Sequence, residues 1–348
     1  MKTESYHDLH DSNPVKIELF DLHPSERNYN NIDCCYEKLK EKLRKARKLQ
    51  AFSMNFDSVY IFKGYNACKF RNPCDVKISH NCQCILISEF SNSNILVFDL
   101  LSKEYRMRIP TPGMPMYLAI EENYDGCNKD ALYFDCNSTK IVYKYNLNAL
   151  LDLLGMPKKD DEYNSALLWE SCSFENPRAI ALYNSESTYS TYKNLYVCNY
   201  GGHFVSMLRS DSGQLVQKID LYIRSPYGIV AISENEIVVS DFTDNFVRVW
   251  RYQSDNGRWQ QVVTIGSVGE AHCQIRWPQG VAFDQASKNI IVCDSGNSRL
   301  QIFSKDGTFL KLFEFSSRNH CPDGLCVNNH TGELLVSDYN ENLVHIFK

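Results

Sequence analysis

WPQGVAFDQASKNIIVCDSGNSRLQIFSKDGTFLKLF, residues 277–313, contains four short apolar runs separated by turn-forming residues. The runs are rich in β-branched and aromatic residues, and Gly, Asn, Asp and Ser cluster between them. Runs of this length and composition predict four consecutive antiparallel strands. A single four-stranded sheet leaves one face uncovered, so we expect the pattern to recur along the chain.

The pattern does recur in the flanking sequence. Clear copies lie at 225–250 and 321–348, and looser copies begin near 72, 114 and 176. Each copy starts at a proline, and these prolines are Pro73, Pro115, Pro177, Pro226, Pro278 and Pro322. Six units of this size predict an all-β, six-bladed propeller over residues 53–348, with blades starting near 72, 114, 176, 225, 277 and 321.

The fifth copy also resembles a known repeat. Pro278-Gln-Gly-Val-Ala, followed by Val292-Cys-Asp-Ser-Gly-Asn-Ser-Arg-Leu-Gln-Ile-Phe, is similar to the signature of NHL repeats, as in the C-terminal domains of tripartite-motif NHL proteins. The copies at 226–250 and 322–347 resemble it clearly, and that at 177–208 weakly. The copies at 73–98 and 115–145 lack the Gly after the Pro and the full Asn/Arg turn. The resemblance is specific for fold, since the family includes RNA-binding modules, substrate-binding modules and a zinc-dependent amidating lyase.

The sixth copy ends at its third strand, so an outer strand must come from elsewhere or an edge is left open. SVYIFKGYNACKFRNP (58–73) is similar in shape to 262–278, which joins one copy to the next. We therefore expect residues 58–64 to form the outer strand of the last blade, the alternative being a disordered lead-in.

Residues 1–52 form a predicted appendage with an irregular arm at 1–32. DCCYEKLKEKLRKARKLQAF (33–52) predicts an amphipathic helix, with Asp33 as its N-cap and apolar residues every three or four positions. Seven Lys/Arg between Lys38 and Lys48 make this helix basic, so it either lies along the propeller or contacts a partner or membrane surface. A second helix is expected at Leu147–Leu154, between the second and third blades.

Composition narrows the class of protein. The chain has no apolar run long enough to span a membrane and no signal peptide, which predicts a cytoplasmic protein without an integral membrane segment. The 14 cysteines include no CxxC pair, so we expect reduced thiols packed as small apolar groups. Net charge is −5 overall, which is a poor electrostatic footprint for sequence-blind nucleic-acid binding.

In a propeller, whose strands are named a to d from the centre outward, the b–c turns and d–a connections lie on one face, here called the top face. Each strand b is predicted to end at a polar residue: Glu89, Asp135, Asn199, Asp241, Asp294 and Asp338. Arginines near the prolines are Arg71, Arg178, Arg224, Arg276 and Arg318. Either these groups pair and lock the loops, or some remain free around the mouth of the channel.

Guanidinium and aromatic groups on this face predict a binding site for a protein or peptide, with single-stranded RNA as the alternative ligand. The candidate residues are Arg71, Phe90, Arg178, Tyr200, His203, Arg224, Tyr227, Phe242, Asp244, Arg276, Arg299, Arg318, Tyr339 and Asn340. The resemblance allows a role in substrate recognition for ubiquitin transfer. This sequence has no RING or B-box array, so ligase activity would require a partner.

A metal-dependent lyase or lactonase is the remaining alternative. The lyase of this family binds zinc through three His from different blades. Here His203 is expected in a b–c turn, His80 and His330 on the opposite face, and His345 within a strand, so three imidazoles are not expected to converge. Asp75 and Asp323 are too few for a lactonase calcium site. We therefore predict a non-catalytic interaction module with no metal and no cofactor, although His80, Cys82 and Cys84 lie close in sequence.

Overall fold

The computed structural model describes residues 48–66, 68–154, 164–172, 174–183 and 193–348. The chain divides into two units, Met1–Ala46 and Arg47–Lys348, and only the second is described. The predicted arm at 1–32 and almost all of the predicted basic helix therefore lie outside the described residues. Residues 48–52, at the end of the predicted helix, are not helical.

The described chain folds into six antiparallel sheets of four strands each. Blade 1 contains β2 (Pro73–Ser79), β3 (Cys84–Glu89), β4 (Asn94–Asp99) and β5 (Tyr105–Pro110). Blade 2 contains β6 (Pro115–Glu121), β7 (Ala131–Cys136), β8 (Ile141–Asn146) and β9 (Leu167–Ser171). Blade 3 contains β10 (Pro177–Leu182), β11 (Asn194–Asn199), β12 (Phe204–Arg209) and β13 (Leu215–Ile219).

The second half repeats the arrangement. Blade 4 contains β14 (Pro226–Ser233), β15 (Glu236–Asp241), β16 (Phe246–Gln253) and β17 (Arg258–Ile265). Blade 5 contains β18 (Pro278–Asp284), β19 (Asn289–Asp294), β20 (Arg299–Ser304) and β21 (Phe309–Glu314). Blade 6 contains β22 (Pro322–Asn328), β23 (Glu333–Asp338), β24 (Leu343–Phe347) and β1 (Ser58–Phe62).

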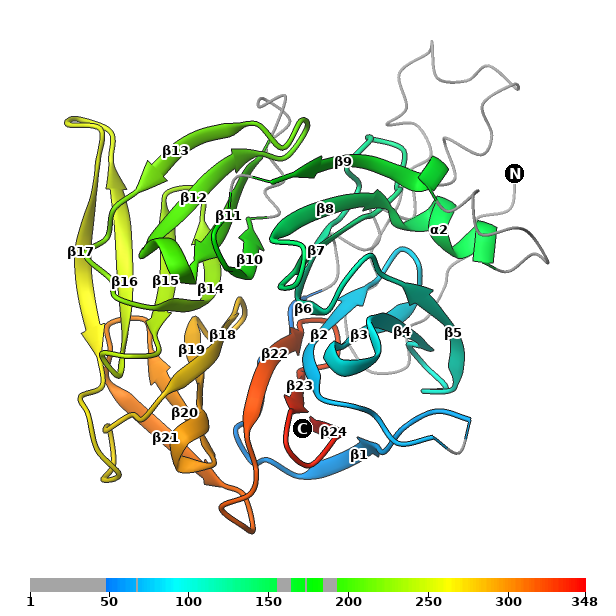
Figure 1. Cartoon of the computed structure of the whole chain (residues 1–348). Coiled ribbons are helices and arrows are strands. Elements are labelled where there is room, and N and C mark those ends of the chain that lie inside the picture. Colours follow the sequence, from blue (N-terminus) through cyan, green and yellow to red (C-terminus); the bar gives the residue numbers. More distant parts are fainter. Residues whose placement is uncertain (1–47, 67, 155–163, 173, 184–192) are drawn as a thin grey trace, which may run out of the picture. The chain divides into compact units, whose positions relative to one another are not determined.

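The inner strands form a closed ring around a central axis (Figure 1). Each inner strand contacts the inner strand of the next blade, and β22 contacts β2. All six inner strands begin at the prolines that mark the sequence repeats. The prediction of a six-bladed propeller is thus confirmed.

The ring is closed by pairing between the two ends of the described chain. Strand β1 pairs antiparallel with β24, with Ile61 opposite His345 and Phe62 opposite Val344. The backbones of Asp57 and Lys348 exchange two hydrogen bonds, of 3.1 and 2.9 Å. This pairing confirms the predicted closing strand and removes the open edge of β24.

Residues just before β1 also pack on the propeller. The side chains of Phe52 and Phe56 are buried in a cluster that includes Phe347, and the ring of Phe56 stacks on Phe313 at 4.6 Å. The backbone amide of Phe52 donates to Asp284 Oδ2 at 3.0 Å. These contacts join the closing segment to blades 5 and 6 before it reaches β1.

Helix α2 (Leu147–Leu154) has the predicted bounds but a different place in the fold. It lies between β8 and β9, so it is inserted within blade 2 rather than between blades 2 and 3. Its apolar residues Leu147, Leu150 and Leu151 are buried against that blade. Within the described residues, no helix is long and apolar enough to span a membrane.

The described cysteines are all free thiols. Cys74, Cys84, Cys136, Cys198 and Cys293 are buried, as expected for thiols that pack as small apolar groups. The expectation of burial is wrong for Cys68, Cys127, Cys172 and Cys273, which are exposed.

Ring closure depends on the packing of β1. The Phe62 side chain is 2% exposed and contacts the Phe98 ring at 4.8 Å, whereas Val59 on the same strand is 49% exposed. Phe62→Ala should lower the free energy of unfolding by about 3–5 kcal/mol, because it leaves a cavity where β1 meets blade 1. Val59→Ala should change it by about 0.5 kcal/mol or less. Urea denaturation measures both, and equal effects would contradict the proposed importance of this closure.

Candidate functional site

Buried polar residues at the ends of the b strands hold the d–a connections of the top face. Glu89, Asp241 and Asp294 lie opposite Pro73, Pro226 and Pro278 in the a–b pairing. Each accepts a backbone N–H from the residue two positions before its proline: Arg71 at 2.9 Å, Arg224 at 2.8 Å and Arg276 at 2.7 Å. These carboxylates are therefore occupied in fixing the loops, and they do not form an acidic ring open to a ligand.

Blade 2 departs from the predicted register. Cys136, not Asp135, lies opposite Pro115. Asp135 is one position earlier, where its Oδ1 accepts the backbone N–H of Tyr117 at 2.7 Å and its Oδ2 is buried without a partner. Burial raises the pKa of the Asp135 carboxyl well above its ordinary value, which favours the neutral acid.

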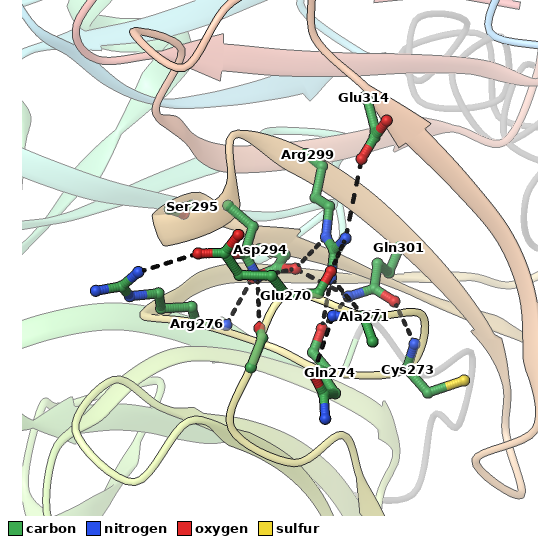
Figure 2. Close-up of polar contacts among 12 residues, drawn as sticks. Glu270, Ala271, Cys273, Gln274, Arg276, Asp294, Ser295, Arg299, Gln301 and Glu314 are labelled. Atoms are coloured by element: carbon green, nitrogen blue, oxygen red, sulfur yellow. Dashed lines mark hydrogen bonds and ion pairs between the residues drawn. The ribbon is translucent and has the colours of Figure 1, made fainter.

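Arg299 is part of the framework and not of an exposed binding surface. Its side chain is 3% exposed and forms an ion pair with Asp294, with Nε and Oδ2 2.6 Å apart. Its other nitrogens donate to the carbonyl oxygens of Glu270, Ala271 and Gln274 (Figure 2). The expectation that Arg299 is available to a ligand is wrong, because all of its strongest donors are already satisfied inside the fold.

The remaining arginines fall into two groups. Arg224 pairs with Asp244 at 3.4 Å, while Arg276 and Arg318 both pair with Glu270, at 3.4 and 3.5 Å. These pairs are long and exposed, so each contributes little to stability and can be exchanged for contacts to a ligand. Among the described residues, Arg71 and Arg178 form no ion pair, Arg71 being exposed and Arg178 half-buried.

An aromatic stack runs across the top of blades 3 to 5. The Trp277 ring stacks on Phe242 at 6.3 Å, and Phe242 stacks on Tyr227 at 5.4 Å. Tyr200 meets Tyr227 edge to face at 6.1 Å. Guanidinium groups lie over both ends, with Arg276 over Trp277 at 4.7 Å and Arg178 over Tyr200 at 5.4 Å.

The stack ranges from buried to exposed residues. Tyr227 is buried, at 8% exposed, so it supports the stack from below and does not reach the surface, although the sequence predicts it as a binding residue. Phe242 and Tyr200 are half-buried, as are Phe90 and Tyr339, whose rings lie 6.3 Å apart across blades 1 and 6. Asn340 is exposed beside them and donates to Asn319 O at 3.0 Å.

A surface cavity of about 660 Å³ lies beside the stack, at the junction of blades 3 and 4. His203 lines it, is exposed, and is hydrogen-bonded through Nδ1 to the carbonyl oxygen of Arg224. The complete lining is Gly202, His203, Phe204, Lys218, Asp220, Tyr222, Ile223 and Arg224. The cavity thus combines both charges with two aromatic rings.

Two exposed aromatic residues of this face were missed from the sequence. Trp277 is 46% exposed and Tyr222 is 85% exposed. Both lie in d–a connections, within four positions before a repeat proline. Arginines in the same connections are among the predicted binding residues, and aromatic residues near the repeat prolines carry the same signal in the sequence.

The channel beneath the stack contains buried ionisable groups. Tyr117 Oη donates to Asp323 Oδ1, and burial raises the pKa of Asp323 to about 7. Lys77 pairs with the nearby Asp75, with Nζ and Oδ1 2.6 Å apart.

The Arg178 Nη1 donates to Met116 Sδ, and its buried Nε has no hydrogen-bond partner. The rings of His80 and His330 contact each other, with their centroids 3.8 Å apart, and His203 lies in the turn between β11 and β12 of blade 3.

The fold defines a class of protein, the six-bladed β-propeller. A model of the NHL repeat matches residues 276–303, which cover the first three strands of blade 5. The protein brain tumor of Drosophila melanogaster is 24% identical over 176 residues, which is 48% of this chain and 15% of that protein. The chain is thus a six-bladed propeller with an NHL repeat in blade 5, and it is similar to brain tumor over about half of its own length and only a small part of that relative.

Substitution of the buried Arg299 and of the exposed Arg318 should change the free energy of unfolding by different amounts. Arg299→Ala leaves Asp294 as an uncompensated buried charge, so it should lower the free energy of unfolding by about 3–5 kcal/mol. Arg318→Ala removes an exposed ion pair and one long hydrogen bond, from Nη1 to Asn297 O at 3.4 Å, and should cost about 0.5 kcal/mol or less. Chemical denaturation of the two variants checks this, and a small effect of Arg299→Ala would overturn its structural role.

Asp135 should make stability depend on pH. Because its pKa is raised in the folded state, the folded protein keeps a proton that the unfolded chain releases above about pH 4. The wild-type protein therefore loses stability relative to Asp135→Asn as the pH rises from about 5 towards the folded pKa, by at most about 1.4 kcal/mol per pH unit.

Asp99→Asn is the matched control for this pH series. The pKa of the half-buried Asp99 is lowered by hydrogen bonds from the backbone amides of Ser102 and Leu101, so it titrates below the range tested. Its effect on the free energy of unfolding should be constant between about pH 5 and 8. A constant effect of Asp135→Asn over the same range would show that Asp135 does not titrate abnormally.

Proposed function

We propose that this protein is a non-catalytic interaction module that binds an extended protein or peptide segment on its top face. The observation that carries the proposal is the stack formed by Trp277, Phe242 and Tyr227, with Arg276 over its exposed end. Trp, Tyr and Arg are the residue types that contribute most to protein–protein affinity when they anchor a partner. The buried Tyr227 holds the outer rings in place before a ligand arrives, which lowers the entropic cost of binding.

The charges of the face support a peptide more than a nucleic-acid backbone. Glu270 pairs with both Arg276 and Arg318, and Asp244 pairs with Arg224. Acidic groups beside these guanidinium groups reduce the positive potential that phosphates require. A peptide can use the same alternating charges for hydrogen bonds and ion pairs at the rim of the interface.

Single-stranded RNA is the second candidate, and the exposed ring of Trp277 favours it. An unpaired base stacks on such a ring irrespective of its sequence, and Arg276 beside the ring can contact the phosphate. Arg71, which is exposed and free of ion pairs among the described residues, adds a further cation on this face. The net charge of −5 weighs against this candidate.

The two candidates separate in a binding experiment with Trp277→Ala. A random peptide display library is selected on the wild-type protein, and enriched peptides are measured by fluorescence polarisation against each variant. In parallel, a labelled random single-stranded RNA pool is titrated at low and at physiological salt. We expect peptide affinity to fall at least tenfold in Trp277→Ala, because an anchoring ring is lost.

Leu101→Ala is the control, since Leu101 is 81% exposed but lies in a turn on the opposite face. It should leave peptide binding unchanged. RNA affinity that depends on Trp277 and falls steeply with salt, without peptide enrichment, would replace the first candidate by the second. Absence of both peptide and RNA binding, or equal effects of Trp277→Ala and Leu101→Ala, would refute the proposed binding face.

A further inference from the structure

Three side chains of metal-binding type meet at the top of blade 6. His320 comes from the connection between β21 and β22, Asp338 is the last residue of β23, and His345 lies in β24. One donor atom from each lies within 4.8 Å of the other two. All three side chains are largely or fully buried, with His320 the most exposed at 11%.

The hydrogen bonds of the cluster leave a fully buried imidazole nitrogen without a partner. His320 Nδ1 and Asp338 Oδ2 are 2.6 Å apart, and Asp338 Oδ1 accepts the backbone amides of Cys321 and Glu341, both at 3.1 Å. His345 Nε2 is buried and makes no hydrogen bond. A buried polar atom without a partner is costly and indicates a missing ligand, ion or water.

Blade 5 shows how the same position looks when the protein alone satisfies it. There, Asp294 Oδ2 accepts from Arg299 at 2.6 Å and from Gln301 and Asn297, both at 2.9 Å (Figure 2). In the a–b–c register, the residues of blade 6 that correspond to Asn297, Arg299 and Gln301 are Glu341, Leu343 and His345. Blade 6 has thus lost the guanidinium and both amide donors around its buried carboxylate.

We propose that His320, Asp338 and His345 form a binding site for a divalent metal ion, with Zn²⁺ as the ion that the donor set fits best. Zinc binds imidazole nitrogen and carboxylate oxygen at about 2.0–2.2 Å, so donor atoms around it lie about 3.3 Å apart. Three donors already within 4.8 Å of one another reach that spacing through small side-chain movements. The ion replaces the positive charge that Arg299 supplies in blade 5.

The surroundings suit such a site. The Phe315 ring stacks on His320 at 4.7 Å and lies 5.4 Å from His345, which gives the cluster an apolar wall. Three protein donors leave a fourth position, and the partly exposed His320 marks the side from which water or a further ligand enters. Bound metal links the top-face connection at His320 to β24, the strand on which ring closure by β1 depends.

The experiment uses the full chain, freed of metal with a chelator and titrated with Zn²⁺ and, separately, with Co²⁺. Zinc affinity is measured by competition with a chromophoric chelator, and cobalt reports the donor atoms through its visible spectrum. The chain contains 14 cysteines, so a site built from imidazole and carboxylate is recognised by d–d bands without thiolate-to-cobalt charge transfer. We expect one such site per chain, and an increase in the thermal unfolding temperature with added Zn²⁺.

Two variants test the assignment independently of each other. His320→Ala removes a ligand from a loop, and His345→Gln copies the glutamine that blade 5 carries at the same register position. Each should lower Zn²⁺ affinity at this site at least tenfold and abolish the cobalt d–d bands, while the variants still fold without metal. His272→Ala, at an exposed histidine in the connection between blades 4 and 5, should bind as the wild type does.

The outcomes decide the proposal. Loss of the thiolate-free site in both variants, with retention in His272→Ala, supports it. A wild-type protein that shows no such bands and no thermal shift overturns it, and the cluster is then a hydrogen-bonded His–Asp–His network only. Unchanged metal binding in His320→Ala and His345→Gln places the ion elsewhere and equally overturns it.

Discussion

The ring depends on one constraint: near the start of every inner strand a backbone amide loses its partner in the neighbouring strand and needs another acceptor. In all six blades the a–b pairing shifts directly after the proline, which forms a β-bulge. In four blades the freed amide donates to a side-chain oxygen of strand b, at 2.7–2.8 Å. The accepting residues are Ser88, Asp135, Ser240 and Ser337. Because an unpaired buried amide costs about 1–3 kcal/mol, the polar residue at this position stabilises these four blades.

The same hydroxyl groups also join neighbouring blades. Ser240 donates to Gln279 O of blade 5 at 2.6 Å, and Ser337 donates to Cys74 O at 2.7 Å, which connects the last blade to the first. Close approach of the inner strands explains the glycine after the proline as well. A Cβ on Gly280 would lie 2.0 Å from the carbonyl oxygen of Asp323 in the next blade. The residues that recur in the repeat therefore make contacts between blades. Ligand binding depends on the residues that differ from blade to blade.

This division explains what the sequence could predict. The prolines, the turn residues and the strand lengths predict six blades. Because the last repeat lacks its outer strand, the sequence also predicts that the segment at β1 completes that blade. The phase of β7 could not be predicted, because Leu132, Tyr133 and Phe134 are all buried and leave no alternation of apolar and polar residues. Without the correct phase, Asp135 was placed at the strand end, where the structure has Cys136.

The accessibility of individual top-face residues was also beyond the sequence. In the sequence, Arg276 and Arg299 both lie next to predicted turns of the fifth repeat and look equivalent. Arg299 begins strand β20 and turns inward over Asp294, whereas Arg276 lies in the connection and extends over Trp277. Which arginine is buried depends on the path of residues 266–277, whose carbonyl groups surround Arg299, and no local pattern specifies that path.

Comparison of the blades with one another shows what each buried strand-end residue requires. In blade 4, Arg248 lies near enough to Asp241 to interact with its charge, and it has the register position that Gln301 has in blade 5. In blade 3 the strand-end residue is Asn199, which is neutral and needs no cation. Ser206 has the register position that Arg248 has in blade 4.

Blade 6 keeps a fully buried carboxylate, Asp338, but the described residues offer it no guanidinium or ammonium partner. In blade 1, the strand-end Glu89 accepts instead from Tyr65 Oη at 3.5 Å and from the Arg71 amide. Desolvation of an ionised carboxylate is compensated only by charge or by several donors. Asp338 Oδ1 accepts two backbone amides, so the second oxygen, Oδ2, depends on the two imidazoles, which supply positive charge either by carrying a proton or by holding a cation between them and the carboxylate. His345 Nε2 is buried without a hydrogen bond, so a cation is the arrangement that gives a partner to this nitrogen as well as to the carboxylate, as Arg299 gives one to Asp294 in blade 5.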